Sequence, residues 1–354
     1  MRTRLLVISF LLAGALCACE DQVESFQAVH GRGIVNGEVA EAGQFPSTVA
    51  LGGEFGSSGP SAMCSGNLVT PRVIISAAHC GDGIPIELVQ AMGVAYFGTD
   101  VTAADTEIGF ENLVIHPDYV PLDNAAGELG EFDLSVFVLE EDAPVEPTWF
   151  RREAVTDEDV GAELTSVGFG ITSSTADDSG TKRYARLVLD DYDENFLISF
   201  NSTNPTDSNI CSGDSGGPQF FYQDGFYVEG AVHSWGDQNC QIESGSTRVD
   251  IATEWFLDQI EAVHGLRDVC EINGWYDDGL CHPFCDLPDP DCVPDAGADA
   301  DADADAGADA GGDHGLTGGG CGCAISQRPS SGLLSALLFS LIAGLVLARR
   351  RSRS

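Results

Sequence analysis

Basic side chains are scarce in this sequence. Lys and Arg total 16 among 354 residues, against 56 Asp and Glu, which gives a formal net charge of −40. Nucleic-acid binding needs clustered Lys and Arg to neutralise phosphates, so the composition argues against a nucleic-acid partner. It predicts a soluble chain that repels anionic partners. The length and the 43% hydrophobic content allow one large domain or two medium-sized ones, with tails.

Long hydrophobic runs are confined to the two ends of the chain. Near the N-terminus, two arginines precede an apolar run at 5–16 and then small residues. This pattern predicts a secretory signal peptide over 1–19. Its end resembles a bacterial lipobox, in which Cys19 is lipidated, and ordinary cleavage after Ala15 is the alternative. Both interpretations predict export, and the polar residues 20–33 that follow are expected to be a pro-segment.

At the other end, the apolar run Leu333–Ala348 falls slightly short of the ~20 residues of a usual membrane span. Before it, an Asp/Ala/Gly-rich segment over 293–320 predicts a disordered spacer, because its hydrophobicity is low and its charges repel. Residues 321–354 combine Cys321 and Cys323, the apolar run and an arginine cluster. This order resembles a myxobacterial-type sorting segment, processed near the cysteines; a permanent single-span membrane anchor is the alternative. We expect a protein of the cell envelope or surface, or one released after processing.

Paired C-x-x-C motifs are absent from the cysteine-rich segment 270–292, whose spacing is C-x10-C-x3-C-x6-C. In an exported chain these thiols face an oxidising compartment, and so short a segment has little to bury. We therefore predict a small module held by two disulfides. The same considerations argue against zinc. The Asp residues of the module offer calcium ligands, but acidic loops are common in so acidic a chain, and we predict no metal.

Between the ends, residues 34–264 contain many short runs rich in Val, Ile, Phe and Thr, separated by Gly, Pro, Asn and Asp. Such a pattern predicts an all-β barrel or sandwich. Near the end of this region, apolar residues follow helical spacing from Ile251 to Val263. This spacing predicts an amphipathic helix that closes the domain.

The strongest chemical motif is Gly213-Asp214-Ser215-Gly216-Gly217. A serine hydroxyl is a weak nucleophile that needs an adjacent base and backbone N–H groups directed at the oxyanion. Flanking glycines let the backbone turn tightly enough to supply those groups. An esterase or lipase with an α/β-hydrolase fold also carries a serine between glycines. That fold, however, needs alternating strands and helices and the order Ser, acid, His.

Two further residues complete a candidate triad in the order His, Asp, Ser. His79 lies in the motif Ser76-Ala77-Ala78-His79-Cys80, and Asp133 is a lone acid in the apolar run 132–139. A buried carboxylate without a partner is costly. An imidazole that the carboxylate orients is therefore the expected partner of Asp133.

These motifs resemble those of the trypsin/chymotrypsin family of serine proteases, over residues 34–264. Besides the nucleophile motif, six segments match in order: Ile34-Val35-Asn36-Gly37, Ser76 to Cys80, His116-Pro117-Asp118-Tyr119, Gly168-Phe169-Gly170, Ser234-Trp235-Gly236 and Thr247-Arg248-Val249. The resemblance implies an all-β fold of two packed six-stranded antiparallel β-barrels with a C-terminal helix, in a protease domain over 34–265. It also implies a serine endopeptidase that acts on proteins or peptides without a cofactor.

The family's mechanism assigns a role to each motif residue. Ser215 would attack the peptide carbonyl, and His79 would take its proton and donate it to the leaving amine. Asp133 would orient His79 and stabilise its cation, and the N–H groups of Gly213 and Ser215 would form the oxyanion hole. The resemblance also implies two disulfides: Cys64 with Cys80, and Cys211 with Cys240.

The resemblance further implies synthesis as a zymogen. Cleavage before Ile34 by an activating protease would release an α-amino group that pairs with Asp214 and orders the oxyanion loop. Activating cuts in the family usually follow Arg or Lys. Here Gly33 precedes Ile34 and Arg32 lies one residue earlier, so cuts after either residue are alternatives.

The substrate pocket implied by the resemblance contains six residues: Asn209, Ile210, Ser234, Trp235, Gly236 and Ser244. Asn209 stands where trypsin-like enzymes carry an Asp at the pocket floor, and a neutral amide cannot pair with Arg or Lys as a carboxylate does. We therefore expect no strong preference for basic residues. A medium-sized apolar or polar side chain before the cut is the prediction.

The main alternative function is a non-catalytic protease homologue that binds a partner at the cell surface. Such homologues usually lose a triad residue or the oxyanion glycine, and all of these are present here. The remaining histidines show no metal-ligand spacing and are expected at the surface or in loops: His30, His233, His264, His282 and His314.

Overall fold

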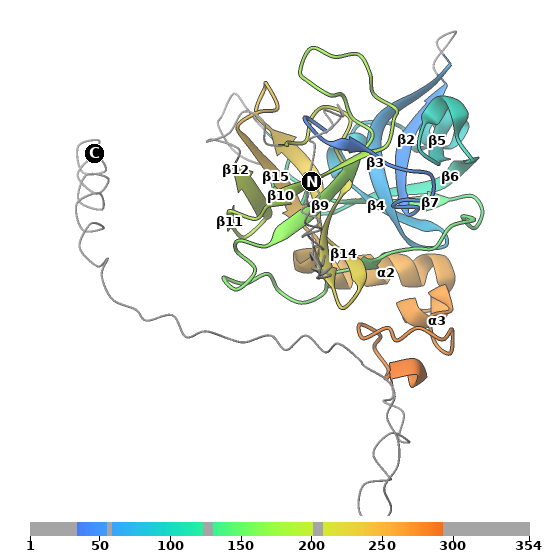
Figure 1. Cartoon of the computed structure of the whole chain (residues 1–354). Helices are drawn as coiled ribbons and strands as arrows, with labels where there is room; N and C mark the ends of the chain where they lie inside the picture. The colour runs from blue at the N-terminus through green and yellow to red at the C-terminus, as the bar shows by residue number, and fades with distance from the viewer. Residues whose placement is uncertain (1–33, 55–58, 123–129, 201–207, 293–354) are drawn as a thin grey trace, which may run out of the picture. The chain divides into compact units, whose positions relative to one another are not determined.

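The computed structural model describes four segments of the chain: 34–54, 59–122, 130–200 and 208–292. They form two β-rich halves side by side, with the helices of residues 253–273 along one edge (Figure 1). The signal peptide, lipobox and pro-segment predicted for the N-terminus, and the spacer and sorting segment predicted for the C-terminus, lie outside the described residues. None of the helices in these segments has the length and apolar character that a bilayer span requires.

The N-terminal half is a closed barrel of six antiparallel strands in the order β2-β3-β4-β7-β6-β5. The strands are β2 (Thr48–Glu54), β3 (Pro60–Thr70), β4 (Val73–Ser76), β5 (Gly93–Phe97), β6 (Thr106–Ile115) and β7 (Ser135–Leu139). Val49 and Leu51 lie two residues apart in β2 and join one buried cluster with Leu68 of β3 and Ile74 of β4. Alternation along each strand therefore fills the interior of the barrel.

The C-terminal half is a nine-stranded sheet in the order β1-β10-β9-β13-β14-β15-β12-β11, with β8 beside β14. Its six longer strands are β9 (Glu163–Gly168), β10 (Arg183–Val188), β12 (Phe196–Phe200), β13 (Pro218–Gln223), β14 (Phe226–Gly236) and β15 (Glu243–Arg248). Three two-residue strands extend them: β1 (Glu38–Val39), β8 (Trp149–Phe150) and β11 (Asp191–Tyr192). Leu164 of β9 and Leu197 of β12 meet in one buried cluster, so the sheet curls on itself. The predicted chymotrypsin-like fold is confirmed, with three short strands beyond the expected six.

Helices are few in the described segments. They are α1 (Ile86–Met92), α2 (Thr253–His264) and α3 (Val269–Asn273), with the 3-10 turns η1 (Ala78–Cys80), η2 (Val101–Ala103), η3 (Asp250–Ala252) and η4 (Pro290–Cys292). The predicted closing helix is α2, which buries Phe256, Leu257 and Ile260. It ends at Gly265, whose φ of 68° is a conformation that glycine adopts at little cost. The buried face of α2 shares a core with strands of both halves.

The cysteine-rich segment packs against that same core. Two disulfides hold it, Cys270–Cys285 and Cys281–Cys292. Trp275 is 5% exposed, and its ring centroid lies 4.3 Å from that of Trp149 in β8. We expected this segment to have little to bury, but it buries a large aromatic side chain. The sequence of the segment alone does not reveal this contact, because Trp149 lies more than a hundred residues earlier in the chain.

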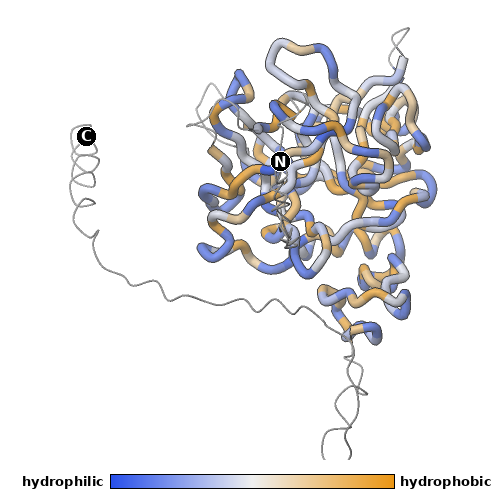
Figure 2. Tube along the Cα trace, in the orientation of Figure 1, coloured by the Kyte–Doolittle hydropathy of each residue, from blue (hydrophilic) through white to orange (hydrophobic). Residues whose placement is uncertain are grey.

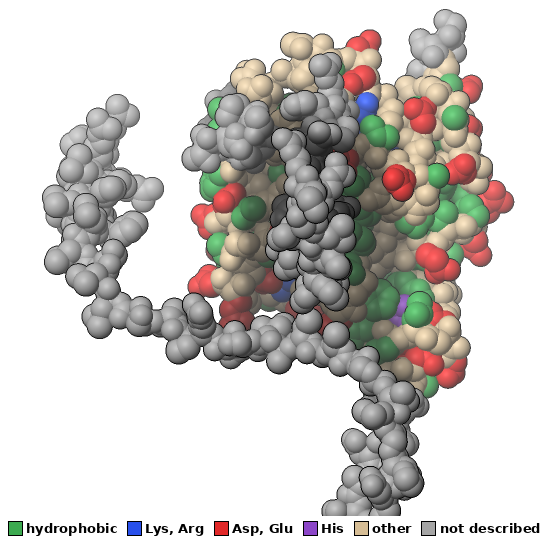
Figure 3. Space-filling model, in the orientation of Figure 1, with side chains coloured by type: hydrophobic (Ala, Val, Ile, Leu, Met, Phe, Trp, Pro, Cys, Tyr) green, Lys and Arg blue, Asp and Glu red, His purple; other side chains and the backbone are tan. Residues whose placement is uncertain are grey.

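The surface reflects the acidic composition. Hydrophilic residues lie mainly in the outer loops of the two halves (Figure 2). On the face shown in Figure 3, Asp and Glu side chains are frequent and Lys and Arg side chains are few. The described residues visible on this face therefore form no basic patch for a polyanion.

Candidate active site

His79 and Asp133 form a directly bonded pair. Nδ1 of His79 lies 2.7 Å from Oδ2 of Asp133, and the backbone N–H of His79 donates to Oδ1 at 2.9 Å. The hydroxyl of Ser234 also donates to Oδ2, at 2.6 Å. Three hydrogen bonds thus stabilise a carboxylate that is only 4% exposed. Since Nδ1–H donates to the carboxylate, Nε2 of His79 carries the free lone pair of a base.

Aromatic packing positions Asp133. The residue before it, Phe132, has a positive φ of 47°. The ring of Phe132 stacks on His116, with centroids 4.7 Å apart and planes 7° apart. His116 in turn makes an edge contact with Trp255 of α2. The His116 motif therefore anchors the turn that presents Asp133, a role its sequence did not reveal.

Ser215 lies in the turn before β13. The strand β13 pairs with β14, which carries Ser234. The carbonyl of Ser215 accepts a 2.8 Å hydrogen bond from the N–H of Ser65 in the barrel. Ser215, Ser234 and Trp235 line one pocket, and His79, Asp133, Ser234 and Trp235 line the next. The candidate nucleophile and base therefore flank the same two residues of β14. Within the described segments, no hydrogen bond joins the Ser215 hydroxyl to the imidazole.

Positive φ angles and close contacts require glycine on both sides of Ser215. Gly213 has a φ of 94°, and a Cβ there would lie 2.9 Å from the Cα of Gly170. Gly216 has a φ of 81°, and a Cβ there would lie 2.1 Å from Oγ of Ser76. Among the interactions of the described residues, the N–H groups of Gly213 and Ser215 donate to no protein acceptor. Both N–H groups remain available to a substrate oxygen.

Asp214 points away from Ser215 into the protein. Its carboxylate is fully buried and accepts 2.8 Å hydrogen bonds from the N–H groups of Gly170 and Cys211. Burial raises the pKa of Asp214 to about 7. No Lys, Arg or His in the described segments forms an ion pair with it. A buried carboxylate without an ion-pair partner is stabilised by any cation that comes close to it.

Ile34 approaches the same loop. Its side chain is fully buried, and the next residue, Val35, pairs with Asn209, two residues before Cys211. The predicted partners Ile34 and Asp214 thus belong to neighbouring parts of one buried region. Arg32 and Gly33, where the activating cut is predicted, lie outside the described residues.

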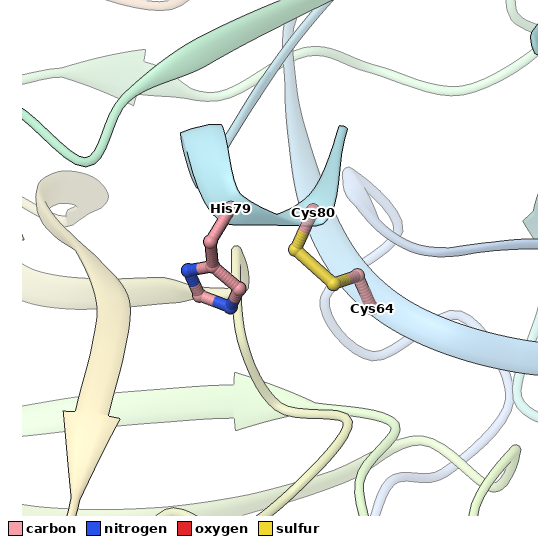
Figure 4. Close-up of side chains that lie close together, drawn as sticks. All are labelled: Cys64, His79 and Cys80. Carbon is pink, nitrogen blue, oxygen red and sulfur yellow. A yellow bond between two sulfur atoms is a disulfide. The ribbon is translucent and has the colours of Figure 1, made fainter. Parts of the chain in front are cut away.

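Two disulfides brace the site. Cys64 pairs with Cys80, the residue after His79, and Cys211 pairs with Cys240 across the pocket that Ser215 lines. Figure 4 shows the first disulfide beside the His79 ring. One ring nitrogen of His79 and these two sulfurs lie within 4.8 Å of one another, but the sulfurs are bonded to each other and offer no thiolate.

Comparison with known proteins agrees with this geometry. The family described as Trypsin matches residues 34–256. The chain belongs to the trypsin family. Serine protease SP24D of Anopheles gambiae is 29% identical over 196 residues, which cover 53% of this chain and 67% of that protein. Phenoloxidase-activating factor 1 of Holotrichia diomphalia is 26% identical over 234 residues, 56% of this chain and 62% of that protein. Ovochymase of Halocynthia roretzi is 28% identical over 203 residues, 52% of this chain and 12% of that protein. The matched region therefore covers about two thirds of the length of the first relative, slightly less of the second and a small fraction of the third.

The pocket of this trypsin-family chain differs in part from the predicted one. A cavity of about 190 Å³ is lined by Ile210, Cys211, Ser212, Ser215, Ser234, Trp235, Gly236, Asp237 and Cys240. Asn209 and Ser244 do not line it. The Asn209 side chain donates to the carbonyl of Glu243 and accepts from the N–H of Ile210. Local backbone partners thus hold Asn209 in the wall behind the cavity.

Two histidines expected at the surface or in loops are buried. His233 lies in β14 with 0% exposure, and His282 lies in the cysteine-rich segment with 4% exposure. His282 packs on Trp275 and lies 3.1 Å from the carboxylate of Asp278. His233 lies directly before Ser234 in the strand that lines the site. Its place directly after the apolar residues Ala231 and Val232 was the signal that could have identified it as buried.

Proposed function

We propose that this chain is an exported serine endopeptidase whose triad is His79, Asp133 and Ser215. The observation that carries the proposal is the network in which Asp133 binds both His79 and Ser234, next to a cavity that Ser215 lines. A buried carboxylate that fixes an imidazole beside a serine is the arrangement that activates a weak hydroxyl nucleophile. Membership of the trypsin family supports the same assignment.

In the proposed reaction, Ser215 attacks the peptide carbonyl while Nε2 of His79 takes its proton. Asp133 keeps the other imidazole proton on Nδ1 and stabilises the cation. The N–H groups of Gly213 and Ser215 bind the oxyanion, and His79 then protonates the leaving amine. Water hydrolyses the acyl-enzyme by the same steps in reverse.

Activation by cleavage before Ile34 is part of the proposal. The new α-amino group would be the cation that the buried Asp214 carboxylate lacks, and the pair would fix the turn that carries Gly213 and Ser215. The activating enzyme would be another protease. Because activation depends on a free amine, the uncleaved chain is expected to be nearly inactive.

Export is the third part of the proposal. Four disulfides in the described segments favour an oxidising compartment. The predicted signal peptide and C-terminal sorting segment would place the enzyme at the cell envelope or surface, attached to the membrane through its C-terminal segment or released by processing. Its substrates would be proteins or peptides outside the cell.

The deciding experiment is labelling of the mature protein with a fluorophosphonate probe, read out by peptide mapping. Labelling at Ser215, lost in Ser215→Ala and in protein that is still uncleaved, is the expected result. N-terminal sequencing of the same sample identifies the activating cut. A folded protein that begins at Ile34 and takes up no label would favour the alternative, a binding homologue without catalytic activity.

A further inference from the structure

The first barrel carries a second cavity, which we call the barrel cavity. Its volume is about 190 Å³, and its walls come from β2, β3, β6, β7 and α1. Every described residue that lines it is apolar, a glycine or a disulfide cysteine, and none of them lines the two cavities beside Ser215 and His79. An engineered cavity of about 150 Å³ lined by Leu, Ile and Phe stays dry and binds benzene, so the barrel cavity has room for one apolar side chain.

The barrel cavity opens to solvent between exposed apolar side chains. Among the residues that line it, Met63 is 53% exposed, Leu88 45% and Met92 37%. Leu88 and Met92 lie four residues apart in α1 and therefore share one face of this helix. Large apolar side chains that gather at the surface around a cavity mark a site of interaction. A partner can therefore enter the barrel cavity from solvent.

The methionines of the chain gather at this cavity. The sequence contains three, of which the first is Met1, and the other two are Met63 and Met92. The unbranched, polarizable side chain of methionine adapts to irregular apolar partners and is frequent at surfaces that bind varied peptides. The position of both methionines at one opening therefore favours a polypeptide partner.

The charges around the barrel cavity select among apolar partners. From residue 34 to residue 150, a region that includes the whole barrel, Arg72 is the only Lys or Arg, and it already forms an ion pair. Glu54, Asp82 and Glu87 are exposed, and each lies within two residues of a lining residue. None of these three carboxylates forms an ion pair within the described segments. Such a surface attracts cations and repels fatty acids, anionic lipids and a second copy of this acidic chain.

The Cys64–Cys80 disulfide connects the barrel cavity to the active site. Both cysteines line the cavity. Cys80 directly follows His79 in η1, and its Sγ lies 3.7 Å from the carbonyl oxygen of Ser215. A polypeptide that enters the cavity is therefore separated from the candidate nucleophile by little more than this disulfide.

We propose that the barrel cavity is a docking site for cationic polypeptide substrates. An apolar side chain of the substrate fills the cavity, and flanking Lys or Arg residues face the carboxylates around it. This inference rests on the proposed endopeptidase function, and it concerns a part of the substrate away from the residue before the cut. Docking raises the local concentration of the substrate at Ser215, so it lowers KM and leaves kcat unchanged. The substrate class is basic amphipathic peptides and proteins.

Binding is measured by NMR on mature Ser215→Ala protein with isotope-labelled methionine methyl groups. In a chain that begins at Ile34, Met63 and Met92 are the only methionines, so both signals report on the cavity. The probe is a peptide with one leucine between two pairs of lysines. In matched peptides, serine replaces the leucine or glutamates replace the lysines. The probe is expected to shift both signals, and each matched peptide should bind at least about 10-fold more weakly.

Activity is measured with a peptide that the enzyme cleaves, with and without the same leucine–lysine element attached through a flexible linker. The element is expected to lower KM by about 10-fold with little change in kcat. In Leu88→Gln this gain should be lost, whereas cleavage of the unextended peptide should stay the same, because Leu88 lies outside the active site. Leu280→Gln is the matched control, at an exposed leucine of the cysteine-rich segment, and should keep the full gain.

Methionine signals that stay in place with the probe, or that move as strongly with the glutamate peptide or with octanoate, would overturn the inference. A fall in KM that persists in Leu88→Gln would also overturn it. Absence of fluorophosphonate labelling at Ser215 would instead overturn the proposed function. The titration uses the serine variant, so its result does not depend on that label.

Discussion

The side-chain amide of Asn67 donates a 2.8 Å hydrogen bond to the carboxyl group of Glu229, and both side chains are fully buried. Asn67 belongs to β3 of the barrel and Glu229 to β14 of the second sheet, so this bond joins the two halves of the fold. Burial raises the pKa of Glu229 well above its ordinary value. This shift favours the protonated carboxyl group, and we expect the bond to join two uncharged groups.

The first prediction follows from this neutral state. Glu229→Gln keeps the shape and the acceptor, so its unfolding free energy is expected to stay within about 1 kcal/mol of the parent. Asn67→Ala leaves a buried carboxyl group without its donor, which should cost about 1–3 kcal/mol. Urea unfolding in a Ser215→Ala background, which prevents self-digestion, measures both. Equal losses for the two variants would show that Glu229 is charged.

The second prediction concerns Asp214 before activation. Its pKa rises from an ordinary 3.8 in the unfolded chain to about 7 in the folded one. Well below pH 3.8 both states are protonated and there is no effect. As the pH rises towards 7 only the unfolded state loses the proton, so the uncleaved protein is destabilised. At about 1.4 kcal/mol per pKa unit, the loss is about 4 kcal/mol at most.

Unfolding of the uncleaved Ser215→Ala protein from pH 4 to pH 8, with and without Asp214→Asn, isolates this effect. The decline should become smaller in Asp214→Asn by the contribution of Asp214, and the part that remains belongs to other buried groups such as Glu229. The contribution of Asp214 should also be lost after cleavage before Ile34, because the new amine keeps Asp214 charged and paired. A cleaved protein with the same pH dependence as the uncleaved one would argue against the Ile34–Asp214 pair.

The third prediction separates the two partners of Asp133. Asp133→Asn should lower kcat by about 10²–10⁴-fold, because the amide does not hold His79 as a base. Ser234→Ala removes one of three hydrogen bonds to the carboxylate, worth about 1.5–3 kcal/mol, and should lower kcat by about 10- to 100-fold. Steady-state kinetics with one peptide measure both. A fall in kcat/KM that comes from KM alone would show that Ser234 only binds substrate.

The sequence motifs predict the candidate catalytic residues better than they predict the residues around the pocket. Ser215, His79 and Asp133 lie in local motifs with chemical meaning, and the helical spacing at 251–263 is clear in the sequence. The buried position of His233 was missed because its surroundings depend on which strands pair. Both faces of β14 are buried from Val228 to His233, so a one-residue change in register would exchange the two sets of neighbours, and the strand's own pattern does not determine that register.

The cysteine-rich segment illustrates the same limit and leads to the last prediction. Trp275 contacts Trp149 of β8, so the segment contributes to the core of the protease domain. Trp275→Ala should cost about 3–5 kcal/mol, the usual loss for a large buried aromatic side chain. Leu280→Ala, at a side chain of the same segment that is 59% exposed, is the matched control and should change stability little. Thermal unfolding of the Ser215→Ala protein reports both. Should Trp275→Ala unfold at the parent temperature, the segment is an appendage, and its disulfides stabilise only itself.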